Sequence, residues 1–373
     1  MKYTEIETET ELIATLKGAS RITAKAFQNL NFATVEALAL QNTFHDCLFL
    51  GCIIPESLNA RGIKDCLVFP SIDVPFNAFI NSLYTKKMLY GAYMPGKPDS
   101  YQNTHDKIVY DHYIKSGKEA DDIKETLARR LHDHAITDAM YDFLEGYEEK
   151  KVVGIMGGHG LSRGEENFLL IAKISKKLTE SGYLMVSGGG PGAMEATHVG
   201  AWFAGRSERD LQEAIRILAE APDFKDKWWL DKAFEVLDRY PDSAYKSLGV
   251  PTWLYGHEPP TPFASHIAKY FDNSVREDGL LTIAKGGIIF SPGSAGTIQE
   301  VFQEATQNHY LSFEYASPMV FLNSRYWPVE VPIYPLIQKM MEEGKYKHLI
   351  LSLCDTVEEV IREIEKFSKE NGL

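Results

Sequence analysis

The sequence predicts an α/β protein whose larger part is a doubly wound parallel sheet, preceded by a mixed α+β N-terminal domain. From residue 152 onward, short apolar strands alternate with amphipathic helices, a pattern typical of a parallel sheet with helices on both faces. The charged stretch YEEKK ends at Lys151 and runs directly into the apolar stretch VVGIM. The length of 373 residues also exceeds one ordinary domain of roughly 150 residues. We therefore expect one domain over 1–149 and a second over 150–373.

The strands expected in the second domain are short apolar runs, at 152–156, 183–187, 249–256, 287–290, 318–322 and 348–353. Helices with apolar residues at helical spacing are expected between them, at 165–182, 193–205, 266–286, 298–310, 334–344 and 357–369, with a helical, tryptophan-containing insertion near 223–240.

The N-terminal half carries weaker signals. A helical pattern covers 121–144, and a strand is expected at 65–69. The stretch FHDCLFLGC resembles a turn of a β-solenoid, but two such turns are too few to establish a repeat. The fold of this half stays unassigned.

Composition and charge exclude several classes of function. The net charge of −13 argues against a nucleic-acid or membrane partner. The acidic N-terminus lacks the features of a signal peptide, and no apolar run reaches the roughly 18 residues that span a bilayer, so we expect a cytoplasmic protein. The four cysteines have no CxxC spacing and are expected to be buried small hydrophobes rather than disulfides or a zinc site.

Three glycine-rich turns follow expected strands, where ligands of a doubly wound sheet gather and helix N-termini present free N–H groups. Tight turns also need glycine for conformational reasons alone, but three together favour phosphate binding. None matches the dinucleotide or Walker fingerprint, so a mononucleotide or sugar phosphate fits better. The glycines are Gly157, Gly158 and Gly160 in turn 1, Gly188, Gly189, Gly190 and Gly192 in turn 2, and Gly293 and Gly296 in turn 3.

Turn 3 lies in SPGSAGTIQE, which permits two interpretations of Glu300. Thr297 and Glu300 have the spacing of a capping box, in which the carboxylate only closes the start of a helix. Alternatively, Glu300 lies beside a buried stripe of Ile298, Val301, Phe302 and Ala305 and close to bound phosphate. A carboxylate beside phosphate is electrostatically unfavourable, which indicates a chemical task.

SGGGPGAMEA followed by PGSAGTIQE resembles the LONELY GUY (LOG) family of nucleotide 5′-monophosphate phosphoribohydrolases, whose signatures are a GGG turn ending in Gly-x-Met and the motif PGGxGTxxE. The resemblance covers about 150–373 and implies a Rossmann-like nucleotide-binding domain. It also implies hydrolysis of a nucleoside monophosphate to free base and ribose 5-phosphate, without metal or organic cofactor. The matching positions are Gly192, Met194, Gly293, Gly296, Thr297 and Glu300, while Ser294 replaces a motif glycine and His159 stands near a family serine.

The resemblance further implies a catalytic arginine one helix upstream, which Arg276 matches with a one-residue offset in register. With Glu300 it would form the catalytic pair, and the substrate would be AMP or another purine nucleotide. The resemblance and the long amphipathic helices together suggest a homodimer or higher homo-oligomer.

Two rival functions stay open. One is a non-catalytic nucleotide-sensing protein with 1–149 as its output module. The other is pyridoxal-dependent decarboxylation, for which Lys285 is the only lysine close to the motif. Among the histidines, His132 and His134 point apart on a helix and are expected in a core or interface rather than on a metal, and His257 is a candidate for the pocket rim.

Overall fold

The computed structural model describes residues 3–63 and 65–372, and the chain divides into two compact units. Unit 1 comprises Met1–Leu83 and Asp111–Asp142, and unit 2 comprises Tyr84–Tyr110 and Phe143–Leu373. This division differs from the expected one at 149/150, because Tyr84–Tyr110 and 143–149 belong to unit 2. Within the described ranges, no helix combines the length and the apolar character needed to cross a membrane.

Unit 2 is built on a parallel sheet, as the sequence predicts. In the described part of the chain this sheet has seven strands in the order β10-β9-β8-β7-β11-β12-β13. The strand order reverses between β7 and β11, so the sheet is doubly wound. The strands are β7 (Val152–Met156), β8 (Leu184–Ser187), β9 (Ser247–Gly249), β10 (His266–Ile267), β11 (Gly287–Phe290), β12 (Pro318–Leu322) and β13 (Ile350–Cys354).

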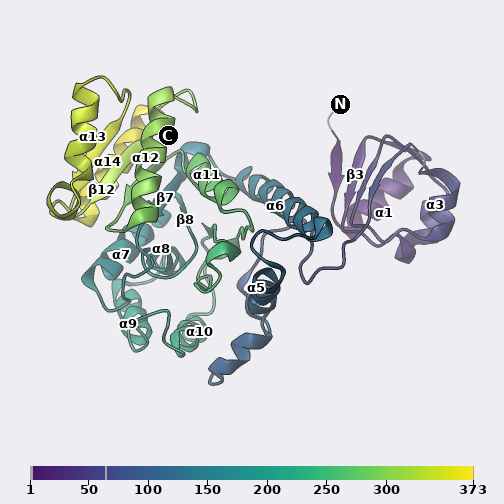
Figure 1. Ribbon diagram of the computed structural model, residues 1–373, viewed down its shortest axis with the longest axis horizontal. Helices are drawn as coiled ribbons and strands as arrows, with labels where there is room; N and C mark the ends of the chain where they lie inside the picture. Colours follow the sequence, from purple (N-terminus) through teal and green to yellow (C-terminus); the bar gives the residue numbers. More distant parts are fainter. Residues whose placement is uncertain (1–2, 64, 373) are drawn as a thin grey trace. The chain divides into compact units, whose positions relative to one another are not determined.

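Helices cover both faces of this sheet (Figure 1). One face packs against a large apolar core that includes Val153 and Ile155 from β7 and Ile171 from α7. On the other face, Tyr334 of α13 contacts Phe321, and a Cβ on Gly154 would touch Ala284 just after α11. The helices are α7 (Glu166–Glu180), α8 (Ala193–Trp202), α9 (Glu208–Leu218), α10 (Trp229–Arg239), α11 (Asn273–Ile283), α12 (Ala295–Tyr310), α13 (Ile333–Glu342) and α14 (Val357–Glu370).

Two expected elements differ from the structure. The strand expected at 249–256 instead occupies Ser247–Gly249, because Pro251 lacks an N–H donor and the Thr252 side chain caps a 3₁₀ turn at Trp253–Tyr255. The helix expected at 266–286 begins only at Asn273, where the Asp272 side chain accepts from the Ser274 amide. Its first residues form the short strand β10.

Residues 84–110, which we call the arm, pack on the sheet of unit 2. They contain α4 (Lys86–Tyr90), a 3₁₀ helix at Pro98–Asn103 and the start of α5 (His105–Ser116). Tyr84 forms an isolated bridge with Ile267 of β10. Lys269 and Asp106 form an ion pair in which both side chains are fully buried. Removing one member of such a pair leaves an uncompensated buried charge, so the pair ties the arm to the sheet.

Unit 1 is a short stack of parallel strands, and the FHDCLFLGC segment contributes two of these strands. Ile22 pairs with Phe44 and Ala26 with Leu48, so that both pairs lie 22 residues apart. The left-handed corner residues Ala24 and Asp46 repeat at the same interval. The two sheets, β1-β3-β5-β6 and β2-β4, are formed by β1 (Thr4–Ile6), β2 (Arg21–Thr23), β3 (Lys25–Gln28), β4 (Thr43–His45), β5 (Leu48–Leu50) and β6 (Leu67–Phe69), beside α1 (Glu9–Gly18), α2 (Glu36–Ala39) and α3 (Glu56–Gly62).

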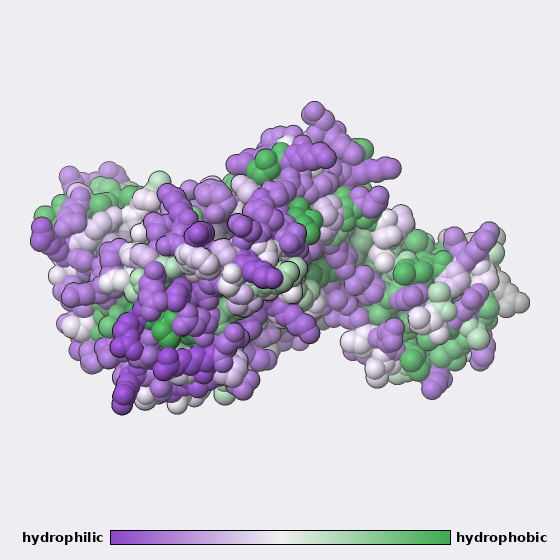
Figure 2. Space-filling view, turned by 90° about the horizontal axis from the view of Figure 1, so that it is seen from below, coloured by the Kyte–Doolittle hydropathy of each residue, from purple (hydrophilic) through white to green (hydrophobic). Residues whose placement is uncertain are grey.

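Aromatic side chains fill this stack. Phe27 and Phe49 stack with ring centroids 5.1 Å apart, and Phe32 and Phe44 pack edge-on against Phe27. Cys47 and Cys52 are buried as expected, with their thiols directed at backbone carbonyls. The last strand, β6, leaves its apolar side chains exposed. On the face seen in Figure 2, hydrophobic surface gathers more densely on unit 1, at the right, than on unit 2.

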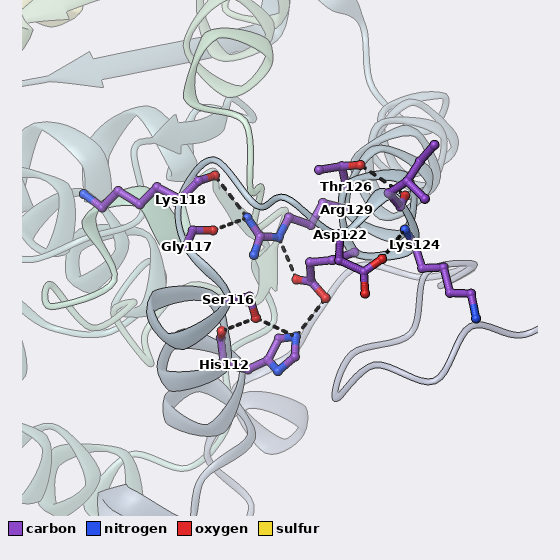
Figure 3. A network of polar contacts seen from close by, with 10 residues as sticks. His112, Ser116, Gly117, Lys118, Asp122, Lys124, Thr126 and Arg129 are labelled. Carbon is purple, nitrogen blue, oxygen red and sulfur yellow. Dashed lines mark hydrogen bonds and ion pairs between the residues drawn. The ribbon is translucent and has the colours of Figure 1, made fainter.

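A buried polar network joins α5 to α6 (Ile123–Leu144) in unit 1 (Figure 3). Arg129 donates to Glu125 at 2.7 Å and to the carbonyls of Gly117 and Lys118, while His112 lies 2.9 Å from Glu125. Nearby on α6, the side chain of His132 is buried and that of His134 is exposed. His132 is therefore a core residue, and the two histidines do not share a site.

Candidate functional site

The three glycine turns meet at the carboxyl end of the sheet, where the strand order reverses between β7 and β11. The Gly158 amide donates to the Pro292 carbonyl at 3.2 Å, which joins turn 1 to turn 3. The Ala193 amide donates to the Gly158 carbonyl at 3.1 Å, which joins turn 2 to turn 1. Ligands of doubly wound sheets bind at this reversal. The structure thus brings the three glycine turns together at this reversal.

Glycine is required in these turns because the backbones approach too closely for a side chain. A Cβ on Gly157 would overlap Ser291 Oγ, and one on Gly192 would overlap the Gly158 carbonyl. Gly189 and Gly192 also have φ values of 69° and 70°, in the left-handed region. The glycines therefore allow the backbones of the turns to pack closely against one another and do more than reverse the chain.

Helix α12 begins at this surface, and its start differs from the predicted capping box. The helix starts at Ala295 with Ser294 at the N-cap, and the Ser294 side chain makes no capping hydrogen bond. Thr297 is consequently the third helical residue and Glu300 the sixth, so Glu300 cannot close the helix start. The amides of the first turn, which includes Gly296, have no partners within the helix and are suited to bind an anion.

Glu300 lies on the buried face of α12, not beside it. The predicted stripe was wrong in this respect, because Ile298 and Phe302 are only half-buried. The side chains that face the protein are those of Thr297, Glu300, Val301, Glu304, Ala305 and Asn308. Glu300 is 9% exposed. Burial raises its pKa to about 7, Arg276 opposes this increase and Glu277 adds to it. The carboxyl group can therefore exchange a proton near neutral pH.

Glu304, one turn further along α12, is a buried carboxyl group with a structural role and provides a comparison for Glu300. Burial raises its pKa to about 7 as well. Its Oε1 accepts from Ser317 at 2.6 Å and from Asn308 at 3.1 Å, so it fastens the end of α12 to the following loop. Among the described residues, none donates such a hydrogen bond to Glu300.

Arg276 of α11 is buried and faces turn 2. Its Nε donates to the Val250 carbonyl at 2.7 Å, and a Cβ on Gly188 would overlap its guanidinium. Within the ranges the structure describes, no ion pair within 4.0 Å joins it to Glu300. Met194 lies against the same turn, with its Sδ 2.6 Å from the position of a Cβ on Gly188. The structure thus brings Arg276, Met194 and turn 2 together.

A chain of buried hydrogen bonds holds turn 2 in place. Ser187 Oγ accepts from the Gly189 amide at 3.1 Å and lies 2.9 Å from His198, whose other ring nitrogen lies 2.9 Å from Ser247. Burial lowers the pKa of His198 to about 3. The neutral ring therefore holds turn 2 in place across the physiological pH range.

Several residues at this location were missed by the sequence reasoning. Ser291 Oγ is buried against turn 1 and has no hydrogen-bond partner among the described residues. Its place directly after a strand and before PGSAG was an available signal. The Tyr326 hydroxyl donates to the Gly293 carbonyl. Glu258 lies 3.5 Å from His159 of turn 1 and 3.7 Å from His257, the candidate for the pocket rim, and nothing in the sequence spacing marks Glu258.

Lys285 lies away from these turns. It pairs with Glu149 at 2.6 Å. Both residues precede strands, β11 and β7 respectively, and so belong to the amino edge of the sheet, opposite the glycine turns. This position argues against a Schiff-base lysine at the site. The one acidic group with metal-ligand geometry among the described residues, Glu5, Asp138 and Asp142, belongs to unit 1.

No protein-family model matches the chain, and no curated protein sequence matches it. Solved structures similar to it include the molybdenum cofactor binding protein from Rippkaea orientalis, with 13% identity and a TM-score of 0.34 over 58% of this chain and 95% of that one. The Chlamydomonas rheinhardtii Moco carrier protein is 14% identical, with a TM-score of 0.34 over 58% of this chain and 97% of that one. The structure of TM1055 is 18% identical, with a TM-score of 0.36 over 57% of this chain and 98% of that one. Similarity at this level does not assign the chain to a family, and the doubly wound α/β architecture of unit 2 rests on its own strand order.

Proposed function

We propose that the chain hydrolyses the N-glycosidic bond of a nucleoside 5′-monophosphate, giving free base and ribose 5-phosphate. The observation that carries this proposal is the buried carboxyl group of Glu300, which accepts no hydrogen bond from the described residues and lies one turn behind a helix N-terminus that faces three convergent glycine turns. The LOG-like motifs that place Glu300, Arg276 and turn 3 in the sequence support the same activity.

The residues of the site suit the steps of this reaction. The phosphate would accept hydrogen bonds from the first amides of α12, and its binding would position the ribose. The bond between C1′ and the base nitrogen breaks through an oxocarbenium-like state, the oxygen of a water molecule bonds to C1′, and one proton of that water ends on the base. Glu300 as a carboxylate would stabilise the positive charge and orient the water. Arg276 would hold the ribose end against turn 2.

The decisive measurement is whether free base appears when the protein is incubated with each common nucleoside monophosphate. Tight nucleotide binding without any free base would support the sensing function instead. Absence of both binding and free base would contradict the proposal.

The role of Glu300 is tested by comparison with Glu304. Glu300→Gln is expected to lower kcat by roughly 100-fold or more, because the charge that faces the developing cation is lost. Glu304→Gln removes a carboxyl group that is also buried and whose pKa is also raised to about 7 from the same helix, and should leave kcat within about threefold of the wild type. Nucleotide affinity should hold or improve in Glu300→Gln, since repulsion of the phosphate is lost. Equal turnover of the two variants would contradict the role of Glu300.

A further inference from the structure

The loop that connects β9 to β10 lies on turn 2. The Thr261 amide donates to the Gly189 carbonyl at 2.8 Å, and Thr261 is fully buried. At its other end, the Trp253 amide donates to the Tyr270 carbonyl at 2.8 Å. Backbone hydrogen bonds therefore hold the loop on both sides of its middle part, which contains His257 and Glu258 and lies beside turn 2.

The arm fixes this loop further. The Tyr90 hydroxyl donates to the Pro260 carbonyl at 2.6 Å. A Cβ on Gly256 would overlap the ring of Tyr110, so ring and loop backbone are in close contact. These contacts hold the loop backbone on both sides of Glu258 and so fix the position from which its side chain extends.

The two oxygens of Glu258 face different surroundings. Oε1 lies 3.5 Å from His159 Nδ1 of turn 1 and 3.7 Å from His257 Nε2. Oε2 lies 3.9 Å from the position of a Cβ on Gly190, and the Met194 methyl group lies 2.9 Å from the same position. The side chain is only 15% exposed. Glu258 therefore presents one acceptor oxygen beside Met194, on the surface of turn 2.

A carboxylate repels phosphate and accepts hydrogen bonds without donating any. In the proposed function the phosphate binds at the start of α12, so Glu258 belongs with an uncharged part of the ligand that carries N–H donors. The thioether of Met194 next to it suits the flat face of an aromatic base. Together these groups match a base with an exocyclic amino group.

We infer that Glu258 is a specificity-determining residue that favours nucleotides whose base carries an exocyclic amino group, as in adenine and cytosine, over those with a carbonyl at that position, as in hypoxanthine and uracil. This inference rests on the proposed function. A carbonyl oxygen facing the carboxylate would leave two acceptors opposed, whereas an amino group donates to it.

The test uses two pairs of ligands that differ mainly in this group, AMP with IMP and CMP with UMP, in calorimetric binding to the full chain. Wild type is expected to bind the amino member of each pair at least about tenfold more tightly, as for a hydrogen bond to a charged group. Glu258→Gln should reduce both ratios to within about threefold, because an amide can donate as well as accept. Glu365→Gln on α14 removes the same charge far along the chain and should keep the wild-type ratios.

Unchanged ratios in a Glu258→Gln variant that still binds AMP would overturn the inference alone, as would a wild-type preference for IMP and UMP. Wild-type protein that binds no monophosphate would overturn both this inference and the proposed function. If Glu258→Gln lowers the melting temperature, His159→Asn provides a second variant. The His159 side chain is 51% exposed, so its replacement should spare the fold while it loosens Glu258 and lowers both ratios.

Discussion

At the scale of single residues, the protonation of Glu300 should appear in activity. Its pKa is raised to about 7, mainly by burial. If the carboxylate is the active form, kcat should rise with pH through about 7 and level off above it. Measuring kcat between pH 5 and 9 checks this expectation. A rate that falls with increasing pH over that window would indicate that the protonated acid is the active form.

The same pKa links Glu300 to stability. Between pH 4.5 and 7 the folded chain keeps the proton while the unfolded chain releases it, so the free energy of unfolding decreases as pH rises through this window. The decrease is on the order of 3 kcal/mol. Glu300→Gln lacks this titration, so its stability relative to wild type should improve from pH 5 to pH 8. Denaturant unfolding at both pH values measures this, and a constant difference would contradict the burial of a neutral carboxyl group.

At the scale of elements, two helical glycines should respond oppositely to alanine. Gly200 lies in α8 where a Cβ would overlap the Ala172 carbonyl of α7, so Gly200→Ala must separate the two helices and should destabilise by about 2 kcal/mol or more. Gly279 lies in α11 with nothing within 4 Å of an added Cβ. Gly279→Ala should stabilise by about 0.5–1 kcal/mol through helix propensity. Chemical denaturation of both variants is the measurement, and shifts of the same sign would contradict the packing argument.

Elements were predictable where one local signal dominates. The strands at Val152–Met156 and Pro318–Leu322 are uninterrupted apolar runs, and the structure has them as the sequence predicts. The start of α12 was not predictable from spacing, because Thr297 and Glu300 fit a capping box that would start the helix at Ile298, while the backbone enters the helix three residues earlier, at Ala295. Glu258 escaped notice for a different reason. Its place beside turn 2 depends on the arm and the loop, whose contacts join residues more than a hundred positions apart.

At the scale of the whole molecule, two units with separate cores should unfold separately. Phe49→Ala removes a ring from the aromatic core of unit 1, and Leu178→Ala opens a cavity in the core of unit 2. Phe49→Ala should lower the free energy of unfolding of unit 1 by about 3–5 kcal/mol, and Leu178→Ala should lower that of unit 2 by about 2–5 kcal/mol. Calorimetry should show two transitions, of which each variant lowers only one. A single transition shifted by both variants would show that the units unfold as one.

We also propose that the chain forms a homodimer through α11 and α12. Val275 is 42% exposed on α11, and Ile298 and Phe302 of α12 are half-buried and lie outside the buried face of that helix. Apolar side chains left at the surface of two neighbouring helices are typical of an interface between copies. Light scattering at micromolar concentration should give the mass of two chains, and Val275→Lys should shift it toward one. A single-chain mass for wild type would contradict this assembly.

The 22-residue interval in unit 1 makes its stack adjustable in length. Each coil repeats the corner at Ala24 or Asp46 and adds one phenylalanine to the central column, as Phe27 and Phe49 do. Because a coil contacts only its neighbours, a tandem copy of residues 24–45 would add one layer, and its one new interface would be between the copied coil and the original. Gene duplication, natural or engineered, can thus lengthen this unit in whole steps without redesigning its core.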